Sequence, residues 1–173
     1  MHLRRFDFDD PTCGLSRGES DLAIVWPPVS AEGVEQLVVT TDRRAVALPV
    51  SDPLATRSEL GPADLGDRDW VVPRAPDAEW QRFRHPASIG VQDVRGVVES
   101  GSVEETLELV AAGAGCALVS ENTDQHYARA GVLIVPLAGN PRCTTALAWR
   151  RSTTDPAVTR IVAEVRSLGL PLG

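Results

Sequence analysis

The stretch "VEETLELVAAGAGCALVSEN", residues 103–122, decides the fold class because two apolar runs meet there at a Gly-Ala-Gly corner. Ser102, just before it, is a good helix N-cap, and Glu105 follows at the spacing of a capping box. Apolar residues then recur at helical spacing, which predicts a helix over 103–112. The glycines end that helix, and "CALVS" predicts a short, fully apolar strand of the buried kind.

Glycine-rich turns also cradle phosphates, so this corner raises the question of a nucleotide site. A dinucleotide-binding turn needs a strand first, then the glycines, then a helix whose N-terminus faces the pyrophosphate. Here the helix precedes Gly113 and Gly115, so both glycines follow a helix C-terminus, where anions are not attracted. We therefore interpret the pattern as a corner between a helix and a strand.

Outward from this corner, strand-like and helix-like segments alternate. Strands are predicted in "HLRRFDFDD", "DLAIVW", 37–41, 44–49, "WVVPR", "RGVVES", "VLIVPL" and "TTALAWRR". Helices are predicted in "DPTCGLSRG", "PDAEWQRFRHP", "NTDQHYARAG" and "DPAVTRIVAEVRSLG", with a helical turn near "PADL". The alternation predicts an α/β fold with mainly parallel sheets, in which ligands bind at the C-terminal ends of strands.

Bulk properties narrow the classes of function. The chain has 173 residues and a net charge of −7, which disfavours direct binding to a nucleic acid. It contains no apolar run long enough to span a bilayer, and "MHLRRFDFDD" lacks the apolar core of a signal peptide, so cytoplasmic residence is expected. The cysteines and histidines are widely scattered, so we expect neither a disulfide framework nor a metal site, and no cofactor is implied: Cys13, Cys116, Cys143, His2, His85 and His126.

Two short motifs suggest catalysis, and each has a simpler interpretation. "GLSRG" matches the Gly-x-Ser-x-Gly pattern around Ser16, but a nucleophile elbow follows a strand and leads into a helix, the reverse of the predicted order. A helix C-terminus capped by Gly18 is the alternative. Asp7 and Asp9 share one face of a predicted strand, where a solvated edge is favoured over a cation site or acid-base chemistry.

A ligand site is indicated instead by polar residues at several strand ends, each followed by a predicted helix. Converging helix N-termini and hydroxyl groups favour a small anionic ligand. Arg74 could pair with a carboxylate or be an ordinary surface arginine, and Trp26 could line a cleft or belong to the core. The strand-end residues are Asp10, Thr12, Pro73, Arg74, Ser100, Gly101 and Ser102.

Taken in order, several pieces resemble the effector-binding domain of LysR-type transcriptional regulators. These pieces are "GESDLAIVWPP", "LVVTTDRRAVALPVSDPLATR", "ADLGDRDWVVP", "LELVAAGAGCALVSE" and "VLIVPLAG...TTALAWRR" with a closing helix. The resemblance covers nearly the whole chain and is specific through the combination of pieces and their spacing. Asp52 stands where the family usually has histidine, and Ser120 where it usually has proline.

The resemblance implies a two-lobed, periplasmic-binding-protein-like fold of type 2. It assigns residues 1–46 and 140–173 to the first lobe and 47–139 to the second, with two crossover strands between them. The first lobe is expected to be truncated, because the family's winged helix-turn-helix and the first strand–helix unit of its effector domain have no counterpart here. The implied effector-binding positions are Asp10, Thr12, Trp26, Pro73, Arg74, Ser100, Gly101, Ser102, Val119 and Ser120.

The function implied is sensing of a small-molecule effector, with an organic acid favoured, to control transcription, and DNA is contacted only through a module that this chain lacks. No membrane partner is implied. A homodimer is possible, and would use the helix at 103–112 and the strand near 3–8. The alternatives are a cytoplasmic enzyme on the same two-lobed fold, a small serine hydrolase using Ser16, or a stand-alone solute-binding protein, which the missing signal peptide disfavours.

Overall fold

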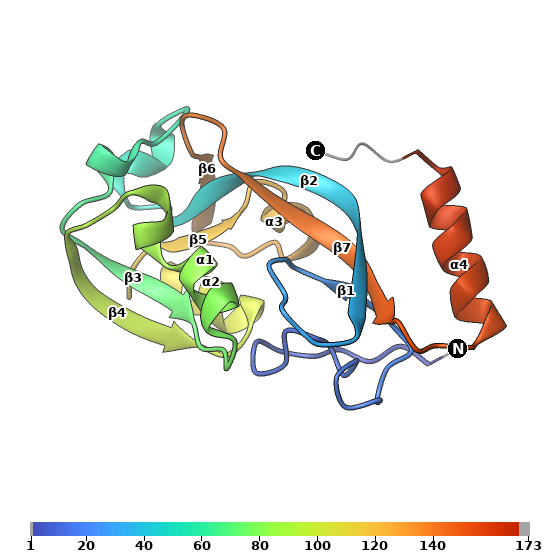
Figure 1. Ribbon diagram of the computed structural model, residues 1–173. Coiled ribbons are helices and arrows are strands. Elements are labelled where there is room, and N and C mark those ends of the chain that lie inside the picture. Colours follow the sequence, from blue (N-terminus) through green and yellow to red (C-terminus); the bar gives the residue numbers. More distant parts are fainter. Residues whose placement is uncertain (1, 170–173) are drawn as a thin grey trace.

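The computed structural model describes residues 2–169 as two α/β lobes joined by two long strands (Figure 1). The strands are β1 (Leu22–Val25), β2 (Val34–Pro49), β3 (Arg68–Pro73), β4 (Val94–Ser100), β5 (Ala117–Ser120), β6 (Val132–Pro136) and β7 (Arg142–Arg150). The α-helices are α1 (Ala78–Arg84), α2 (Val103–Ala111), α3 (Thr123–His126) and α4 (Pro156–Ser167). Short 3-10 turns occupy η1 (Pro53–Thr56), η2 (Pro62–Asp64) and η3 (Pro86–Ile89).

The two joining strands are β2 and β7, which run antiparallel from Val34↔Arg150 to Arg43↔Arg142. Their register shifts between Val38 and Thr40, a bulge that bends the pair. Beyond this stretch β2 leaves β7 and pairs with β5 and β6 on its two sides. The two predicted strands at 37–41 and 44–49 are therefore one continuous strand that serves both lobes.

The prediction of mainly parallel sheets is wrong for the larger sheet. Its order is β1-β7-β2-β5, with β6 also on β2, and every one of these pairings is antiparallel. Parallel pairing joins β3 to β4 and, through the Trp70↔Cys116 bridge, β3 to the start of β5. Alternation along the chain does not reveal which strands pair. Here β1, β5 and β6 pair with the joining strands β2 and β7, which run antiparallel to each other.

The N-terminal predictions are also wrong. Residues 2–7 form no strand, because a strand needs a ladder of backbone hydrogen bonds. The described ties here are the side chains of Arg4 and Arg5, with a backbone bond from Phe8 N–H to Gly101 O (3.0 Å) next to them. Residues 11–18 are successive turns rather than a helix, since Cys13 and Gly14 have positive φ. Asp10 nevertheless caps these turns, because its carboxylate accepts from Thr12 N and Gly14 N.

The Gly-Ala-Gly corner between helix and strand is confirmed. Ser102 Oγ accepts from Glu105 N, and α2 ends before Gly113, whose φ of +80° is left-handed. Gly115 lets the chain pass close to β3, because a Cβ there would lie 2.6 Å from Asp69 O. The remaining predicted helices form at α1, α3 and α4, and Asp155 caps α4 as predicted, with Pro156 in its first turn.

The hydrophobic core is divided between the lobes. In the second lobe, Trp70, Leu48 and Leu60 belong to one cluster, and Val71 packs with Val110 of α2 in another. In the first lobe, α4 packs on Leu147 and Trp149 in one cluster, and Leu15, Val25, Ala146 and Ala148 form another. Trp80 of α1 belongs to that last cluster, so α1 lies across the junction of the lobes. None of the helices in residues 2–169 is long and apolar enough to cross a membrane.

Candidate functional site: a cavity at the lobe junction

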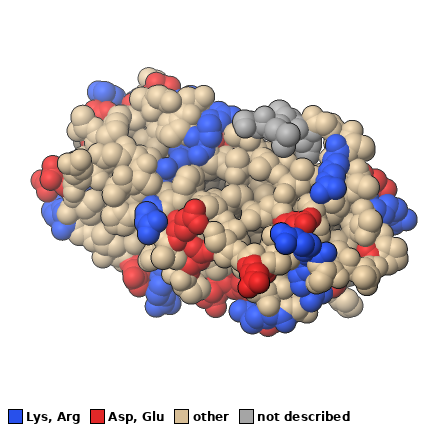
Figure 2. Space-filling model, in the orientation of Figure 1, with Lys and Arg blue, Asp and Glu red and all other residues tan. Residues whose placement is uncertain are grey.

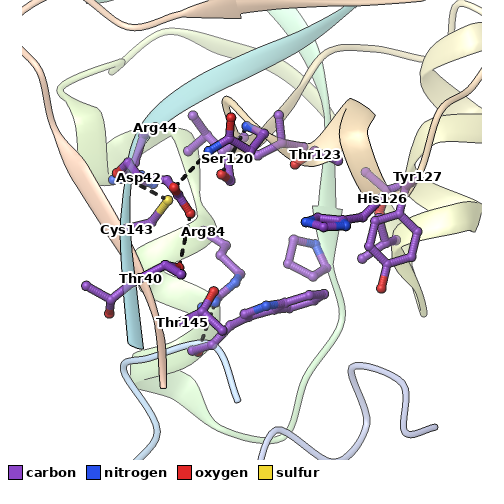
Figure 3. Close-up of a pocket in the computed structure, with 18 of the residues that line it drawn as sticks. Thr40, Asp42, Arg44, Arg84, Ser120, Thr123, His126, Tyr127, Cys143 and Thr145 are labelled. Carbon is purple, nitrogen blue, oxygen red and sulfur yellow. Dashed lines mark hydrogen bonds between the residues drawn. The ribbon is translucent and has the colours of Figure 1, made fainter. Parts of the chain in front are cut away.

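A cavity of about 730 Å³ lies where the two joining strands pass between the lobes (Figure 3). This volume is in the range of small-molecule sites. Strands β2 and β7 form one wall, β5 and α3 a second, and α1 with the loop after β1 a third. A ligand held there would touch both lobes.

The β2 wall presents Thr40, Asp42 and Arg44. These are alternate residues, which point to the same face of a strand. On the neighbouring strand β7, three residues of the same wall also line the cavity: Cys143, Thr144 and Thr145. The crossing point of the two strands is therefore unusually polar, whereas the next residues of β2, Ala45–Leu48, are fully buried and apolar.

Arg44 is a buried cation at 5% exposure. Its Nη2 donates to Phe83 O and to Ser88 Oγ (2.9 Å), and its guanidinium carbon lies 4.3 Å from the centre of the Phe83 ring. Burial lowers the pKa of Arg44. Within residues 2–169 it makes no ion pair with a carboxylate, so its charge is met only by neutral partners.

Arg84, at the end of α1, is a second cation at the same cavity. It stacks over the Trp80 ring at 3.7 Å, and its Nη2 donates to Trp26 O at 2.9 Å. Both guanidinium groups lie near the Phe83 ring, with their carbons 4.3 Å (Arg44) and 5.6 Å (Arg84) from its centre, and these like charges repel. Burial, with a smaller contribution from Arg44, lowers the pKa of Arg84 to about 9. Both are charged at neutral pH, and Arg84 likewise has no carboxylate partner among the described residues.

One carboxylate, that of Asp42, also lines the cavity, and neutral groups hold it. Asn122 Nδ2 donates to it at 2.8 Å, and Thr40 Oγ1 at 3.4 Å. With His126 neutral, the charged lining residues are then Arg44, Arg84 and Asp42, which sum to a charge of +1. The whole chain carries −7, so the cavity lining has the opposite sign to the protein.

Cys143 lies at this charged end as a neutral thiol. Its Sγ contacts Asp42 O at 3.7 Å, and burial raises its pKa. Burial also raises the pKa of Cys13 to about 11 and that of Cys116 to about 12. All three cysteines are free, and among the described residues no group of three or more His, Cys, Asp or Glu is arranged to hold a metal ion.

Aromatic and apolar side chains also line the cavity. Figure 3 shows His126 and Tyr127 on the side away from Arg44 and Cys143. Trp26, Phe8 and Pro73 line it as well. The cavity thus combines two cations with several aromatic rings.

The structure brings four of the ten sequence-predicted positions to this cavity: Trp26, Pro73, Val119 and Ser120. The other six lie outside its lining, and most of their polar groups are already used. Asp10 is 7% exposed and binds Thr12, Gly14 and Arg17. Ser100 Oγ bonds Thr106 Oγ1 at 2.7 Å, Ser102 caps α2, and Glu105 Oε2 accepts from Gly101 N. Arg74 is exposed.

Sequence analysis missed Asp42, Arg44 and Arg84. The sequence contained a signal for Arg44, which directly precedes the apolar run "AVAL". An arginine is rarely buried in a strand unless it has a partner. Arg84 follows Trp80 by one helical turn, the spacing at which an arginine can stack on an indole. Nothing in the sequence showed that these residues meet.

Ser16, the candidate nucleophile, is exposed within the N-terminal turns. Among the described hydrogen bonds no histidine contacts its side chain, and His85 Nδ1 instead accepts from Ala87 N at the start of η3. The arrangement provides no base for a serine nucleophile.

Two α/β lobes, two joining strands and a ligand-sized cavity at their crossing define a periplasmic-binding-protein-like domain of type 2, as predicted. The model of the LysR substrate binding domain family matches residues 1–169, and the chain belongs to that family. It is thus a substrate-binding domain of the LysR class.

The relatives agree with this assignment. The chain is 24% identical over 160 residues to the Hca operon transcriptional activator HcaR of Escherichia coli K12, covering 88% of this chain and 52% of HcaR. It thus spans about half the length of that curated relative. Among solved structures, the BenM effector binding domain with its effector benzoate has 22% identity to this chain and a TM-score of 0.70. The match covers 94% of this chain and 77% of the BenM chain. The Synechocystis CcmR regulatory domain in complex with 2-PG has 18% identity and a TM-score of 0.71, covering 96% and 81%.

Proposed function

We propose that this chain binds a small organic acid in the junction cavity and that, within a longer LysR-type regulator, occupancy of the cavity controls transcription. The observation that carries the proposal is the position of the cavity, between the lobes and against both joining strands. A ligand that contacts both lobes binds one lobe arrangement better than another, and so shifts the population between them. That shift is the signal a regulator needs.

The relatives support the same function. HcaR is named as a transcriptional activator, and the solved BenM and CcmR domains carry benzoate and 2-PG. On the face seen in Figure 2, arginines and acidic residues are both spread over the surface. The cationic lining of the cavity supports an acid as the ligand.

The other components are part of the same proposal. DNA binding would belong to parts of the longer relatives that this chain does not cover, and the regulator would act in the cytoplasm. A homodimer would use α2 and the segment at residues 3–8, which is irregular rather than a strand. The lobes would comprise residues 1–46 with 140–173 and residues 47–139. Separate core clusters support this division, although Trp80 packs into the first-lobe core and Val46 into the second-lobe core.

The test is a thermal-denaturation screen of the purified chain with organic acids, amino acids and sugars. A ligand at about 100 times its dissociation constant stabilises a protein by roughly 2.7 kcal/mol, which raises the melting temperature by a few degrees. We expect a saturable rise with at least one acid. Thr145→Phe, which fills the cavity, should abolish the rise, whereas Thr154→Phe on the exposed surface should not. No rise with any compound in a cooperatively melting protein would contradict the function.

A further inference from the structure

Arg44 and Arg84 differ from the other partly buried arginines of the chain. Arg68 pairs with Asp52, and Arg43 pairs with Glu59. Arg44 and Arg84 donate only to neutral groups, mostly backbone carbonyls. A buried charge without a counter-charge is costly to the fold, and a hydrophobic residue would fill the same place without that cost.

The two residues also sit where a ligand can supply the missing charge. Arg44 comes from the joining strand β2 and Arg84 from α1, and both line the cavity. Arg44 has more donors left without a partner, because only its Nη2 donates among the described hydrogen bonds, whereas both Nη1 and Nη2 of Arg84 do. A carboxylate between the guanidinium groups would relieve their mutual repulsion and receive charge-assisted hydrogen bonds.

The rest of the lining restricts the ligand further. Apart from Arg44, Arg84 and Asp42, no charged side chain lines the cavity when His126 is neutral. A second negative charge on the ligand would therefore meet no further cationic side chain of the lining. Trp26, Tyr127 and Phe83 instead offer ring surfaces that favour a flat apolar body.

We propose that Arg44 and Arg84 bind the carboxylate of the effector and that the effector is a monoanionic acid with an aromatic or similarly flat apolar body. This assignment rests on the proposed function, since it names the ligand class and the recognising residues of the same cavity. It differs from the strand-end positions that sequence analysis favoured. Those positions would place the anion near Ser100–Ser102 and Arg74, outside the lining.

The experiment measures binding of matched pairs of probes to the purified chain by calorimetry. Each pair is an aromatic acid and its neutral amide: benzoate with benzamide, phenylacetate with phenylacetamide, and indole-3-acetate with its amide. The dianion phthalate tests the limit of one charge. Variants are Arg44→Met and Arg84→Met, with Arg74→Met as the matched control because Arg74 is an exposed arginine outside the cavity lining.

We expect at least one acid to bind about tenfold or more tightly than its amide and than phthalate, because a hydrogen bond to a charged group is lost with the amide. Arg44→Met and Arg84→Met should each weaken that acid by about tenfold or more, and Arg74→Met by less than about twofold. If a methionine variant does not fold, the corresponding lysine variant, which keeps the charge but not the planar fork, should show an intermediate loss.

Two results would overturn the assignment, and they are distinguishable. Equal binding of acid and amide, or equal binding by the arginine variants, would remove this ligand class and leave the sensing function intact. Binding only by non-aromatic or dianionic acids in the thermal screen would do the same. No binding by any compound in either experiment would overturn the sensing function as well.

Discussion

The junction around Arg44 and Arg84 and the corner segment Ser100–Gly115 are both rich in polar groups, and these groups are satisfied in opposite ways. At the corner, side chains bond one another or nearby backbone N–H groups. Ser100 bonds Thr106, Ser102 Oγ accepts from Glu105 N, and Glu105 Oε2 accepts from Gly101 N. At the junction, two cations share a cavity with one carboxylate that neutral groups hold. The polar groups of the corner are hydrogen-bonded within the fold, whereas the two cations of the junction have no carboxylate partner among the described residues.

This difference indicates which of the two regions is the better candidate for binding a ligand. A polar residue whose hydrogen bonds are complete gains little from a ligand, because binding would first break an existing contact. A buried charge with neutral partners gains a counter-ion, and so its cost to the fold is recovered on binding. The junction is therefore the better candidate, although the corner has the stronger sequence pattern.

The largest effect on affinity should come from removing both positive charges at the junction. The double variant Arg44→Met with Arg84→Met removes two charged donors, each worth about 1.5–3 kcal/mol to a bound carboxylate. Affinity for the preferred acid should fall roughly 100-fold or more. Calorimetry on wild type, both single variants and the double variant would also give their coupling. A loss below about tenfold in a folded double variant would break the contrast between the two regions.

An intermediate effect, on stability rather than affinity, should follow a change at the corner. Gly115→Ala would place a methyl group 2.6 Å from Asp69 O and 2.8 Å from Asp69 C, so the backbone of α2–β5 or β3 must shift. We expect a loss of about 1–3 kcal/mol in the free energy of unfolding, the range of overpacking changes. Denaturant melts measure it. Gly113→Ala separates backbone strain from steric contact, because an added Cβ there would meet no atom within 4 Å although φ is +80°.

The smallest effect should come from the helix cap. Ser102→Ala removes the side chain that accepts from Glu105 N, which should cost about 1 kcal/mol of stability. Affinity for the acid should change by less than about twofold, because Ser102 does not line the cavity. The control is Ser102→Asp, which restores a capping oxygen. A tenfold loss of affinity in Ser102→Ala with normal stability would instead place the ligand at the corner.

Local chemistry explains which parts of the fold were predictable. The helix at 103–112, the Gly113–Gly115 corner and the Asp155 cap depend on interactions between neighbours in sequence, and all are present. The strand expected near residues 3–8 and the helix expected at 10–18 depended on patterns too short to form without partners. Strand direction failed for a related reason, since pairing of β2 with β7 joins residues about a hundred positions apart.

The candidate site divides in the same way. Trp26 and Pro73 lie at the ends of β1 and β3, the position that α/β folds give to ligand sites, whereas Val119 and Ser120 of β5 were implied only by the family resemblance. Arg44 was missed because the cavity that its face of β2 lines forms only when the lobes pack. Arg84 was missed because α1 reaches the cavity only by packing across the junction through Trp80. Both positions are consequences of tertiary packing.

The most direct measurement is the position of a heavy-atom-labelled acid in crystals of the chain. With 4-bromobenzoate, or the bromo derivative of whichever acid binds best, anomalous scattering locates the bromine independently of the protein. We predict the carboxylate at about 2.7–2.9 Å from guanidinium nitrogens of Arg44 or Arg84, with the ring toward Trp26 and Tyr127. A carboxylate bound instead at Ser100–Ser102 beside Arg74 would contradict the account.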